Sequence, residues 1–472
     1  MPALMQLPVV VVGAGPVGLA AAAHLLENGL TPLVLEAGSR PGTAVRAWGH
    51  TRLFSPWRYN LDAAAVRLLE AAGWRAPHLT VLPTGHELVA EYLEPLAATE
   101  QLAPLIRTGT TVTAVTRQGM DKTHSRLRDE TPFLVRTRTA DGSTNDILAR
   151  AVVDASGTWS TPNPLGQAGL PALGEAEAGV RITRPLPDVL GTDRRHFAGR
   201  HVLVVGAGHS AANTLLSLGE LAKAEPETRI SWAVRGPSVS RLYGGGDLDG
   251  LPARGMLGTR LRKLVETGVV DLHTSFNITG LATDGNGLTV YGGTPGVKQI
   301  LAVDVLIPAT GFRPDLGILK ELRLELDPSV EAARDLGPLI DPEFHSCGTV
   351  PAHGAGLLAH PEKDFYIVGM KSYGRAPTFL LATGYEQVRS VAAALAGNHE
   401  AADQVRLELP ETGVCSADLG SSAGSPAVGS PAAGEQEASS CCTAPEPVLV
   451  GFPTGLQHGR SGETDASGDQ DG

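Results

Sequence analysis

Three glycines near the N-terminus have the spacing of a turn that binds a dinucleotide pyrophosphate. Gly13, Gly15 and Gly18 follow the β-branched run PVVVV, and a second apolar run, PLVLE, ends at Glu36. In such a turn the first glycine makes the bend, the second lets the backbone approach the phosphates, and the third lets helix and strand pack closely. The helix N-terminus attracts the phosphates, and the acid can accept hydrogen bonds from a ribose. We therefore predict a dinucleotide site here.

The same arrangement recurs between residues 201 and 235, with Gly206, Gly208 and Ser210 at the turn. The second strand of this unit ends in Arg235 instead of an acid. A guanidinium can pair with a 2′-phosphate, which a carboxylate would repel, so we predict NADPH rather than NADH. The alternative is an ordinary solvated arginine at a strand end. Two sites imply two dinucleotides, and FAD with NADPH would let electrons pass from nicotinamide to flavin.

The composition indicates a globular α/β protein. The chain has 472 residues, of which 42% are hydrophobic, so it can bury a sizeable core in more than one domain. Its 57 glycines and 34 prolines favour turns between layers of helices and strands over a coiled coil. The net charge is -12, and most of it lies after residue 400. Because the chain has no basic patch or arm, we expect no nucleic-acid partner.

Cysteine usage predicts a reducing compartment. The four cysteines do not make a disulfide scaffold, and they crowd toward one end of the chain. We therefore expect a cytoplasmic protein. The apolar segment of residues 8–26 could be mistaken for a signal or membrane segment, but it lacks a preceding basic region and carries the first glycine turn. We expect no membrane partner.

The C-terminal residues 413–472 are rich in Gly, Ser, Ala, Pro and acidic residues. Such a segment cannot bury enough apolar surface to offset its chain entropy, so we predict a disordered arm. Its thiols, Cys415, Cys441 and Cys442, are soft ligands that suit trivalent arsenic or mercury, and they are our candidates for mobile catalytic thiols. Two alternatives stay open: a redox dithiol formed by the adjacent pair, or a low-complexity tail whose cysteines do nothing.

A second group of metal-ligating residue types lies before this tail. His345, Cys347, His353 and His360 crowd into one segment. Their spacings match no compact zinc ligand pair, so loop and core roles are the better interpretation. We predict no structural metal site.

The two glycine turns resemble those of flavoproteins with two dinucleotide-binding domains, the superfamily of flavin-containing monooxygenases and pyridine-nucleotide disulfide reductases. The likeness covers roughly residues 7 to 397. It implies an NADPH domain inserted into the FAD domain. It also implies that ATG-like motifs mark the two crossings between the domains.

Three further motifs carry this resemblance. VVDASGTWSTP, with Ser156 and Gly157, and VLIPATGFRPD, with Gly311, resemble the two ATG-like crossings. DFYIVGM, with Gly369, resembles the strand that usually closes on Gly-Asp beside the ribityl chain of FAD. Met370 stands at the position of that Asp. The resemblance therefore adds these four small residues to the expected cofactor site and removes one carboxylate from it.

A closer resemblance links the chain to flavoprotein monooxygenases associated with bacterial arsenic-resistance gene clusters. The segments that carry it are LPTGHELVAEYLEPLA, GAGHSAANTLLSL and KSYGRAPTFLLATGYEQV, together with the cysteine-bearing tail. The resemblance implies a role in detoxifying arsenic or another soft metalloid. A thiol-bound metalloid is then the expected small-molecule substrate.

The resemblance leaves two kinds of electron acceptor to compare. Disulfide reductases of this superfamily carry CxxC or CxxxxC beside the flavin or inside the NADPH domain, and neither place holds a cysteine here. The first place offers Trp48 and Trp57, which resemble the aromatic shields of the monooxygenase branch, with core packing as the alternative. The usual monooxygenase fingerprint FxGxxxHxxx(Y/F) is missing before the second turn.

Thr378 and Phe379 are expected at the pyrimidine end of the flavin, before a helix from about Gly384, with capping as the alternative.

We therefore predict a three-layer Rossmann-type FAD domain with an inserted Rossmann-type NADPH domain. The expected boundaries are 1–195 and 307–400 for the FAD domain, 196–306 for the NADPH domain and 401–472 for the tail. The expected activity passes hydride from NADPH to FAD and electrons on to oxygen and a substrate, in the manner of a flavin monooxygenase. One alternative is an NADPH-dependent thiol-disulfide oxidoreductase that uses the tail cysteines, and another is a non-enzymatic metalloid-binding redox sensor. A homodimer is compatible with each.

Overall fold

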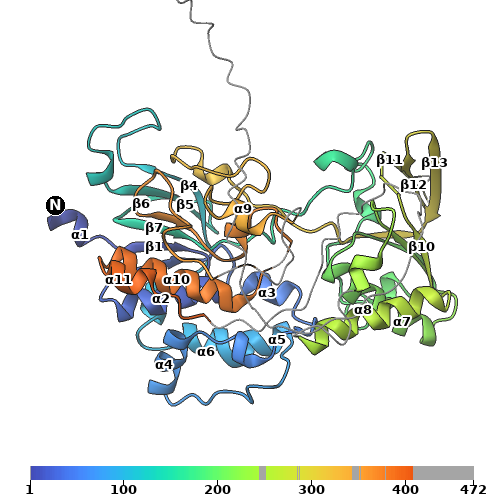
Figure 1. Ribbon diagram of the computed structural model, residues 1–472, viewed down its shortest axis with the longest axis horizontal. Coiled ribbons are helices and arrows are strands. Elements are labelled where there is room, and N and C mark those ends of the chain that lie inside the picture. Colours follow the sequence, from blue (N-terminus) through green and yellow to red (C-terminus); the bar gives the residue numbers. More distant parts are fainter. Residues whose placement is uncertain are drawn as a thin grey trace, which may run out of the picture. The chain divides into compact units, whose positions relative to one another are not determined.

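A computed structural model describes residues 2–243, 251–283, 285, 287–342, 350, 352–377 and 379–407. Its strands form four sheets, two parallel and two antiparallel, and helices cover one face of each parallel sheet (Figure 1). The predicted α/β fold with Rossmann-type parallel sheets is thereby confirmed. Several predictions concern residues outside the described ones: Thr378, His345, Cys347, Cys415, Cys441, Cys442 and the segment 408–472.

The first parallel sheet has the strand order β15-β7-β1-β2-β3. Its central strand is buried on both faces, because Val9 and Val11 lie in one hydrophobic core while Val10 and Val12 lie in another. A run of four β-branched residues suits such a strand. The strands are β1 (Val9–Val12), β2 (Pro32–Leu35), β3 (Ile106–Arg107), β7 (Ala151–Asp154) and β15 (Phe365–Ile367).

Different layers cover the two faces of this sheet. Helices α2 (Pro16–Glu27) and α10 (Leu381–Leu395) pack together on one face, and an antiparallel sheet packs on the other (Figure 1). That antiparallel sheet consists of β4 (Thr110–Arg117), β5 (Phe133–Thr139) and β6 (Thr144–Ala149). The predicted three layers are therefore present. The shorter helices of this part are α1 (Pro2–Met5), α3 (Thr43–Ala47), α4 (Ala63–Ala71), α5 (Gly85–Leu88), α6 (Glu94–Ala97), α9 (Gly337–Ile340) and α11 (His399–Asp403).

A second parallel sheet lies in sequence between β7 and β15, with the strand order β10-β9-β8-β14. Helices α7 (His209–Ala224) and α8 (Pro252–Glu266) pack against its strands, and a second antiparallel sheet shares a core with them. The parallel strands are β8 (His201–Val205), β9 (Arg229–Ala233), β10 (Val270–His273) and β14 (Val305–Pro308). The antiparallel strands are β11 (Gly280–Thr283), β12 (Leu288–Thr294) and β13 (Val297–Val303).

The packing extends beyond two of the predicted domain boundaries. Leu165 and Ala172 lie in the core that also holds Leu203 of β8, so the second sheet gathers residues from well before position 196. Helix α11 crosses position 400, and its Ala402 carbonyl accepts a hydrogen bond from Ser390 Oγ of α10 at 2.7 Å. Packed structure therefore continues into the range predicted for the tail. The domain boundaries themselves stay predictions.

A buried carboxylate ties the antiparallel sheet to the strand that enters the site. Glu362, three residues before β15, accepts a hydrogen bond from Arg117 Nε at 2.7 Å and one from Arg128 Nη2 at 2.8 Å. Its side chain is 0% exposed, and the guanidinium of Arg117 lies over the ring of Phe133, 3.6 Å from the centroid. Two guanidinium groups therefore compensate one buried charge, which fixes the start of the segment 362–371.

Among the residues that the structure describes, every helix is too short or too polar to cross a bilayer. This finding gives no support to the membrane interpretation of the apolar N-terminal segment, part of which forms β1 and α2 instead. The cytoplasmic location stays a prediction.

Candidate functional site

A cavity of about 430 Å³ lies where the two glycine turns come together. We call it the cofactor cavity. Residues just after the ends of β1, β2, β7 and β15 reach it from one edge of the first parallel sheet. Leu381 reaches it from the start of α10, and His209 and Ser210 reach it from the start of α7. The predicted site residues that line it are Gly13, Gly15, Glu36, Trp48, Ser156, Gly157, Ser210, Gly369 and Phe379.

The first turn has the backbone that a pyrophosphate needs. Gly13 has φ +98°, and a Cβ there would lie 2.8 Å from the carbonyl oxygen of Ala155. At Gly18 a Cβ would lie 2.0 Å from the carbonyl oxygen of Gly13, so only glycine allows α2 to pack this close. Gly15 differs, because a Cβ would meet nothing within 4 Å. This open space before the start of α2 fits the phosphates of a dinucleotide.

Glu36 holds the turn in shape from the end of β2. Its carboxylate accepts hydrogen bonds from the backbone N–H of Ala14 at 2.7 Å and from that of Gly38 at 2.8 Å. A carboxylate has about four lone-pair positions, so two remain to accept hydrogen bonds from a ribose. Glu36 lines the cofactor cavity, which places this remaining capacity where the cofactor would lie.

The open position at Gly15 gives a direct test of the FAD site. We predict that Gly15→Val leaves the fold intact, because Gly15 has an extended φ of -80°, but that the purified protein loses most of its bound flavin. The ratio of flavin to protein absorbance measures this loss. Gly179→Val is the matched control, since a Cβ there also meets nothing within 4 Å and the residue does not line the cavity. Equal flavin content in both variants would contradict the assignment.

A buried ion pair supports the second loop of the cavity. Lys371 Nζ donates to Asp154 Oδ2 at 2.7 Å and to Ser156 Oγ at 3.1 Å, and Ser156 Oγ donates to Asp154 Oδ1 at 2.6 Å. The side chains of Asp154 and Lys371 are both 0% exposed. Ser156, which contacts this pair, and Gly157 lie in the cavity wall, and a Cβ at Gly157 would meet nothing within 4 Å. The loop thus offers a second open backbone to the cofactor.

Sequence reasoning missed Lys371 as a member of the site. Its signal was a lysine next to the apolar segment FYIVGM, where a charged side chain has to find a partner if it is buried. Met370, which stands where the related motif has Asp, lines the cavity. The carboxylate that contacts this part of the site is Asp154, the last residue of β7, and it contacts Lys371 and Ser156.

Gly369 is held by polar groups of α10 and of its own loop. Its N–H donates to Gln387 Oε1 at 2.7 Å, and its carbonyl accepts from Ser372 Oγ at 2.7 Å. It has φ +70°, and a Cβ would lie 3.3 Å from Val17, so a larger residue would press on α2. Gln387 also contacts His353 Nε2 at 2.8 Å, which gives that histidine a structural role.

The two tryptophans near the first turn have different surroundings. Trp48 is half-buried and lines the cavity, whereas Trp57 is 2% exposed and belongs to the hydrophobic core. Phe379 lines the cavity and packs edge to face on Tyr373, with ring centroids 5.1 Å apart. Helix α10 begins at Leu381, slightly before the predicted Gly384.

The second turn repeats the geometry of the first. Gly206 has φ +134°, and a Cβ would lie 2.0 Å from the carbonyl oxygen of Ala309, while Gly208 is open at the start of α7. Arg235 is exposed two residues beyond the end of β9 and makes no ion pair within the described part of the chain. Gly206, Gly208, Arg235 and Gly311 do not line the cofactor cavity, and their assignment to an NADPH site stays a prediction.

The segment of residues 51–55 connects the two sites, and sequence reasoning did not assign it. All five residues line the cofactor cavity. The ring of Phe54 contacts that of His209 at the second turn, with centroids 5.1 Å apart. The only sequence signal was its place in the stretch where reductases carry their cysteines. It forms the wall between the first and second turns.

The described residues contain no group of three His, Cys, Asp or Glu side chains that could hold a metal ion. His360 instead hydrogen-bonds to the backbone of Glu325, at 3.1 Å to the carbonyl oxygen. Burial lowers the pKa of the His360 imidazole, although Glu325 opposes this shift. The imidazole is therefore held neutral and acts as part of the loop structure.

Comparison with known proteins agrees with this arrangement. A family described as pyridine nucleotide-disulphide oxidoreductase matches residues 10–346. The ferredoxin–NADP reductase of Salinispora tropica is 28% identical over 325 residues, which cover 68% of this chain and 79% of that protein. That of Salinispora arenicola is 28% identical over 327 residues, 69% of this chain and 80% of that protein.

Solved structures share the fold. Bacillithiol disulfide reductase from Bacillus cereus has a TM-score of 0.62 at 19% identity, over 83% of this chain and 99% of its own. The cadaverine monooxygenase of desferrioxamine biosynthesis from Erwinia amylovora has a TM-score of 0.60 at 14% identity, over 88% of this chain and 99% of its own. The family match covers more than half of the chain. The chain therefore belongs to the pyridine nucleotide-disulphide oxidoreductase family and is an oxidoreductase that depends on FAD and a pyridine nucleotide.

Proposed function

We propose that the protein is an NADPH oxidoreductase of the flavin monooxygenase type. The observation that carries this proposal is the absence of any cysteine from residues 1–346 and from the described residues that line the cofactor cavity. A disulfide reductase of the usual kind needs a dithiol beside the flavin. Bound FAD would accept two electrons from NADPH, and oxygen with a small-molecule substrate is then the acceptor that needs no further protein group.

The walls of the cavity suit this chemistry. Val17, Val45, Leu53, Leu88 and Leu381 line it together with the aromatic rings of Trp48 and Phe379. Apolar walls exclude water, and exclusion of water is what a flavin monooxygenase chiefly asks of its protein. The chain's own polar groups in the wall, such as Glu36 and Ser156, would bind and orient the cofactor.

The choice of NADPH rests on Arg235. We predict that Arg235→Gln raises KM for NADPH by roughly ten- to hundredfold, because a hydrogen-bonded charge pair contributes about 1.5–3 kcal/mol. The KM for NADH should change little, since NADH lacks the 2′-phosphate. Arg229→Gln, an exposed arginine at the other end of β9, is the control. An unchanged ratio of the two KM values in Arg235→Gln would rule out this role.

We extend the proposal to a thiol-bound metalloid as the substrate. Its support is the resemblance described above and the soft-ligand chemistry of Cys415, Cys441 and Cys442, which lie outside the described residues. The two alternative functions use the same three cysteine thiols. The adjacent thiols could accept electrons from flavin as a redox dithiol, or the tail could bind a metalloid without turnover.

The curated relatives favour one other candidate. They are ferredoxin–NADP reductases, so this chain could exchange electrons between NADPH and a one-electron carrier protein. Such a transfer also needs no cysteine beside the flavin. Reduction of a small iron–sulfur protein by NADPH, faster than reduction of oxygen, would favour this candidate.

Turnover of the full chain separates these functions. We expect NADPH consumption in air to rise when an arsenite–thiol complex is added, and to persist in a Cys415→Ser/Cys441→Ser/Cys442→Ser variant at high concentrations of that complex. Reduction of a disulfide dye without oxygen should be slow in both proteins. Fast dye reduction that disappears in the variant would instead show that the protein is a thiol-disulfide oxidoreductase that uses the tail cysteines. Tight arsenite binding without NADPH consumption would favour the non-enzymatic metalloid-binding sensor.

A further inference from the structure

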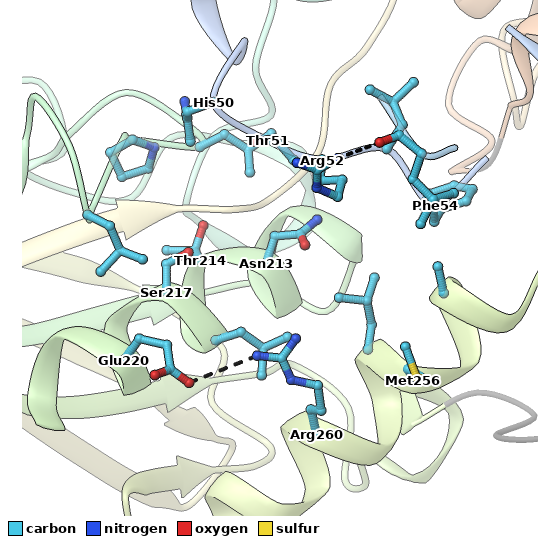
Figure 2. A pocket seen from close by; sticks show the side chains of 18 residues that line it. His50, Thr51, Arg52, Phe54, Asn213, Thr214, Ser217, Glu220, Met256 and Arg260 are labelled. Atoms are coloured by element: carbon cyan, nitrogen blue, oxygen red, sulfur yellow. Dashed lines mark hydrogen bonds and ion pairs between the residues drawn. The ribbon is translucent and has the colours of Figure 1, made fainter. Parts of the chain in front are cut away.

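A second pocket, of about 350 Å³, adjoins the cofactor cavity (Figure 2). We call it the side pocket. One wall is the segment 50–54 with Leu82, another is the segment 186–190, and the third is formed by α7 and α8. Figure 2 shows Asn213, Thr214 and Ser217 of α7 above Arg260 of α8. The volume is that of a site for a small molecule.

The side pocket and the cofactor cavity share a wall. Thr51, Arg52, Leu53 and Phe54 line both spaces, as do Leu186 and Asn213. A molecule in the side pocket would therefore touch the same segment that lines the flavin site. Binding there can therefore be observed through the flavin.

The charges of the side pocket favour an anion. Its one carboxylate, Glu220, accepts hydrogen bonds from Lys223 Nζ at 2.9 Å to each oxygen, so a lysine outside the pocket compensates it. Arg260 lies 4.0 Å from Glu220, beyond hydrogen-bond distance, and forms no other ion pair within the described residues. Arg52 adds a second guanidinium, which donates to the carbonyl of Leu82 and lies 3.8 Å from Glu87. Positive charge therefore exceeds negative charge in this wall.

A buried hydroxyl supplies an independent indication of a ligand. Thr214 is 2% exposed, and its Oγ1 has no hydrogen-bond partner within the described part of the chain. Leaving a buried hydroxyl unsatisfied costs about 1–3 kcal/mol. The Oγ1 atom itself is closed to solvent, so a ligand oxygen would accept its hydrogen bond, and remove this cost, after a small movement of the side chains around it. The rest of the lining is mainly apolar and includes Leu186, Leu190 and Met256.

We propose that the side pocket binds a small organic anion with an apolar body. Its carboxylate would accept hydrogen bonds from the Thr214 hydroxyl and the Arg260 guanidinium, and its hydrocarbon part would pack on Phe54, Leu190 and Met256. This packing would also cover Leu190 and Met256, which are 48% and 59% exposed. Because Phe54 belongs to the shared wall, the bound anion would alter the surroundings of the flavin.

Three matched probes test the class of ligand. Benzoate, benzyl alcohol and benzylamine have similar shapes. At neutral pH benzoate is an anion, benzyl alcohol is neutral and benzylamine is a cation. We would titrate each into the FAD-loaded full chain at neutral pH, without NADPH, and measure heat and the visible flavin spectrum. Benzoate should bind about tenfold more tightly than benzyl alcohol and shift the flavin spectrum. Equal binding of all three, preference for benzylamine, or no binding of benzoate would overturn the proposal.

Variants locate the binding to the side pocket. Arg260→Gln and Thr214→Val should each weaken benzoate binding by about tenfold, since each removes one hydrogen bond to a charged group. Arg262→Gln is the matched control, because Arg262 lies on the same helix over the ring of Tyr243 and does not line the pocket. Equal weakening in the control, or unchanged affinity in both pocket variants, would show that the anion binds elsewhere. Since no turnover is measured, the result does not depend on the proposed function.

Discussion

Replacing Lys371 by methionine is expected to destabilise the folded protein by about 3–5 kcal/mol, because the change leaves Asp154 buried without its counter-charge. The two side chains are 0% exposed and meet at 2.7 Å, so solvent cannot take the place of the lysine. Ser156 would lose one of its two partners at the same time, and we expect weaker retention of FAD. Urea unfolding and the flavin content of the purified variant measure the two effects.

A double variant separates charge from packing. Asp154→Asn/Lys371→Met removes both charges, so it should regain a large part of the stability lost in the single variant. Lys363→Met serves as the control, since Lys363 is exposed on the same segment. A single variant as stable as this control would contradict the buried ion pair. A single variant that unfolds more easily but keeps its flavin would limit Lys371 to a structural role.

The second large effect is expected at Glu362. Glu362→Gln should lower the free energy of unfolding by about 3–5 kcal/mol, because Arg117 and Arg128 would then be buried beside a neutral group. Their side chains are 1% and 3% exposed, so neither guanidinium can reach water without local unfolding. Glu130→Gln, on the exposed part of the same region, is the control. If Glu362→Gln lowers the free energy of unfolding no more than Glu130→Gln does, the contacts of Glu362 with Arg117 and Arg128 do not hold the segment 362–371.

The same carboxylate predicts a pH dependence. Burial by itself would raise the pKa of Glu362, but the hydrogen bonds from Arg128 and Arg117 outweigh it and hold the pKa below its ordinary value of 4.5. Its contribution is therefore complete above pH 4.5 and is lost as the pH falls through the lower pKa of the folded state. The stability difference between wild type and Glu362→Gln should shrink as acid is added below that value. A constant difference down to the acid transition would exclude this linkage.

The parts of the site that the sequence predicted are local in the chain. Gly13, Gly15 and Glu36 belong to one strand, turn and strand unit, in which spacing alone fixes the backbone. In the structure Gly13, Gly15 and Glu36 line one cavity, and Gly18 packs closely against Gly13. The three-layer fold was also predictable, since a run of β-branched residues before a glycine turn indicates a buried parallel strand.

The parts that sequence reasoning missed are contacts between distant segments. Lys371 pairs with a residue 217 positions earlier, and no periodicity in the chain indicates such a pair. The segment 51–55 lies at the second turn, where the ring of Phe54 contacts that of His209, a residue 155 positions later in the chain. In the same way, Leu165 joins the core of the second sheet before the predicted domain boundary. Tertiary packing decides such contacts, whereas local motifs do not contain them.

The most direct test of the central claim is the reduction and reoxidation of the flavin in the full chain. We would mix FAD-loaded protein with NADPH without oxygen, follow the flavin absorbance, and then add oxygen. We predict bleaching by one equivalent of NADPH and rapid recovery in oxygen, at equal rates in wild type and in the Cys415→Ser/Cys441→Ser/Cys442→Ser variant. A flavin that NADPH does not reduce, or that returns its electrons only when the tail cysteines are present, would contradict the claim.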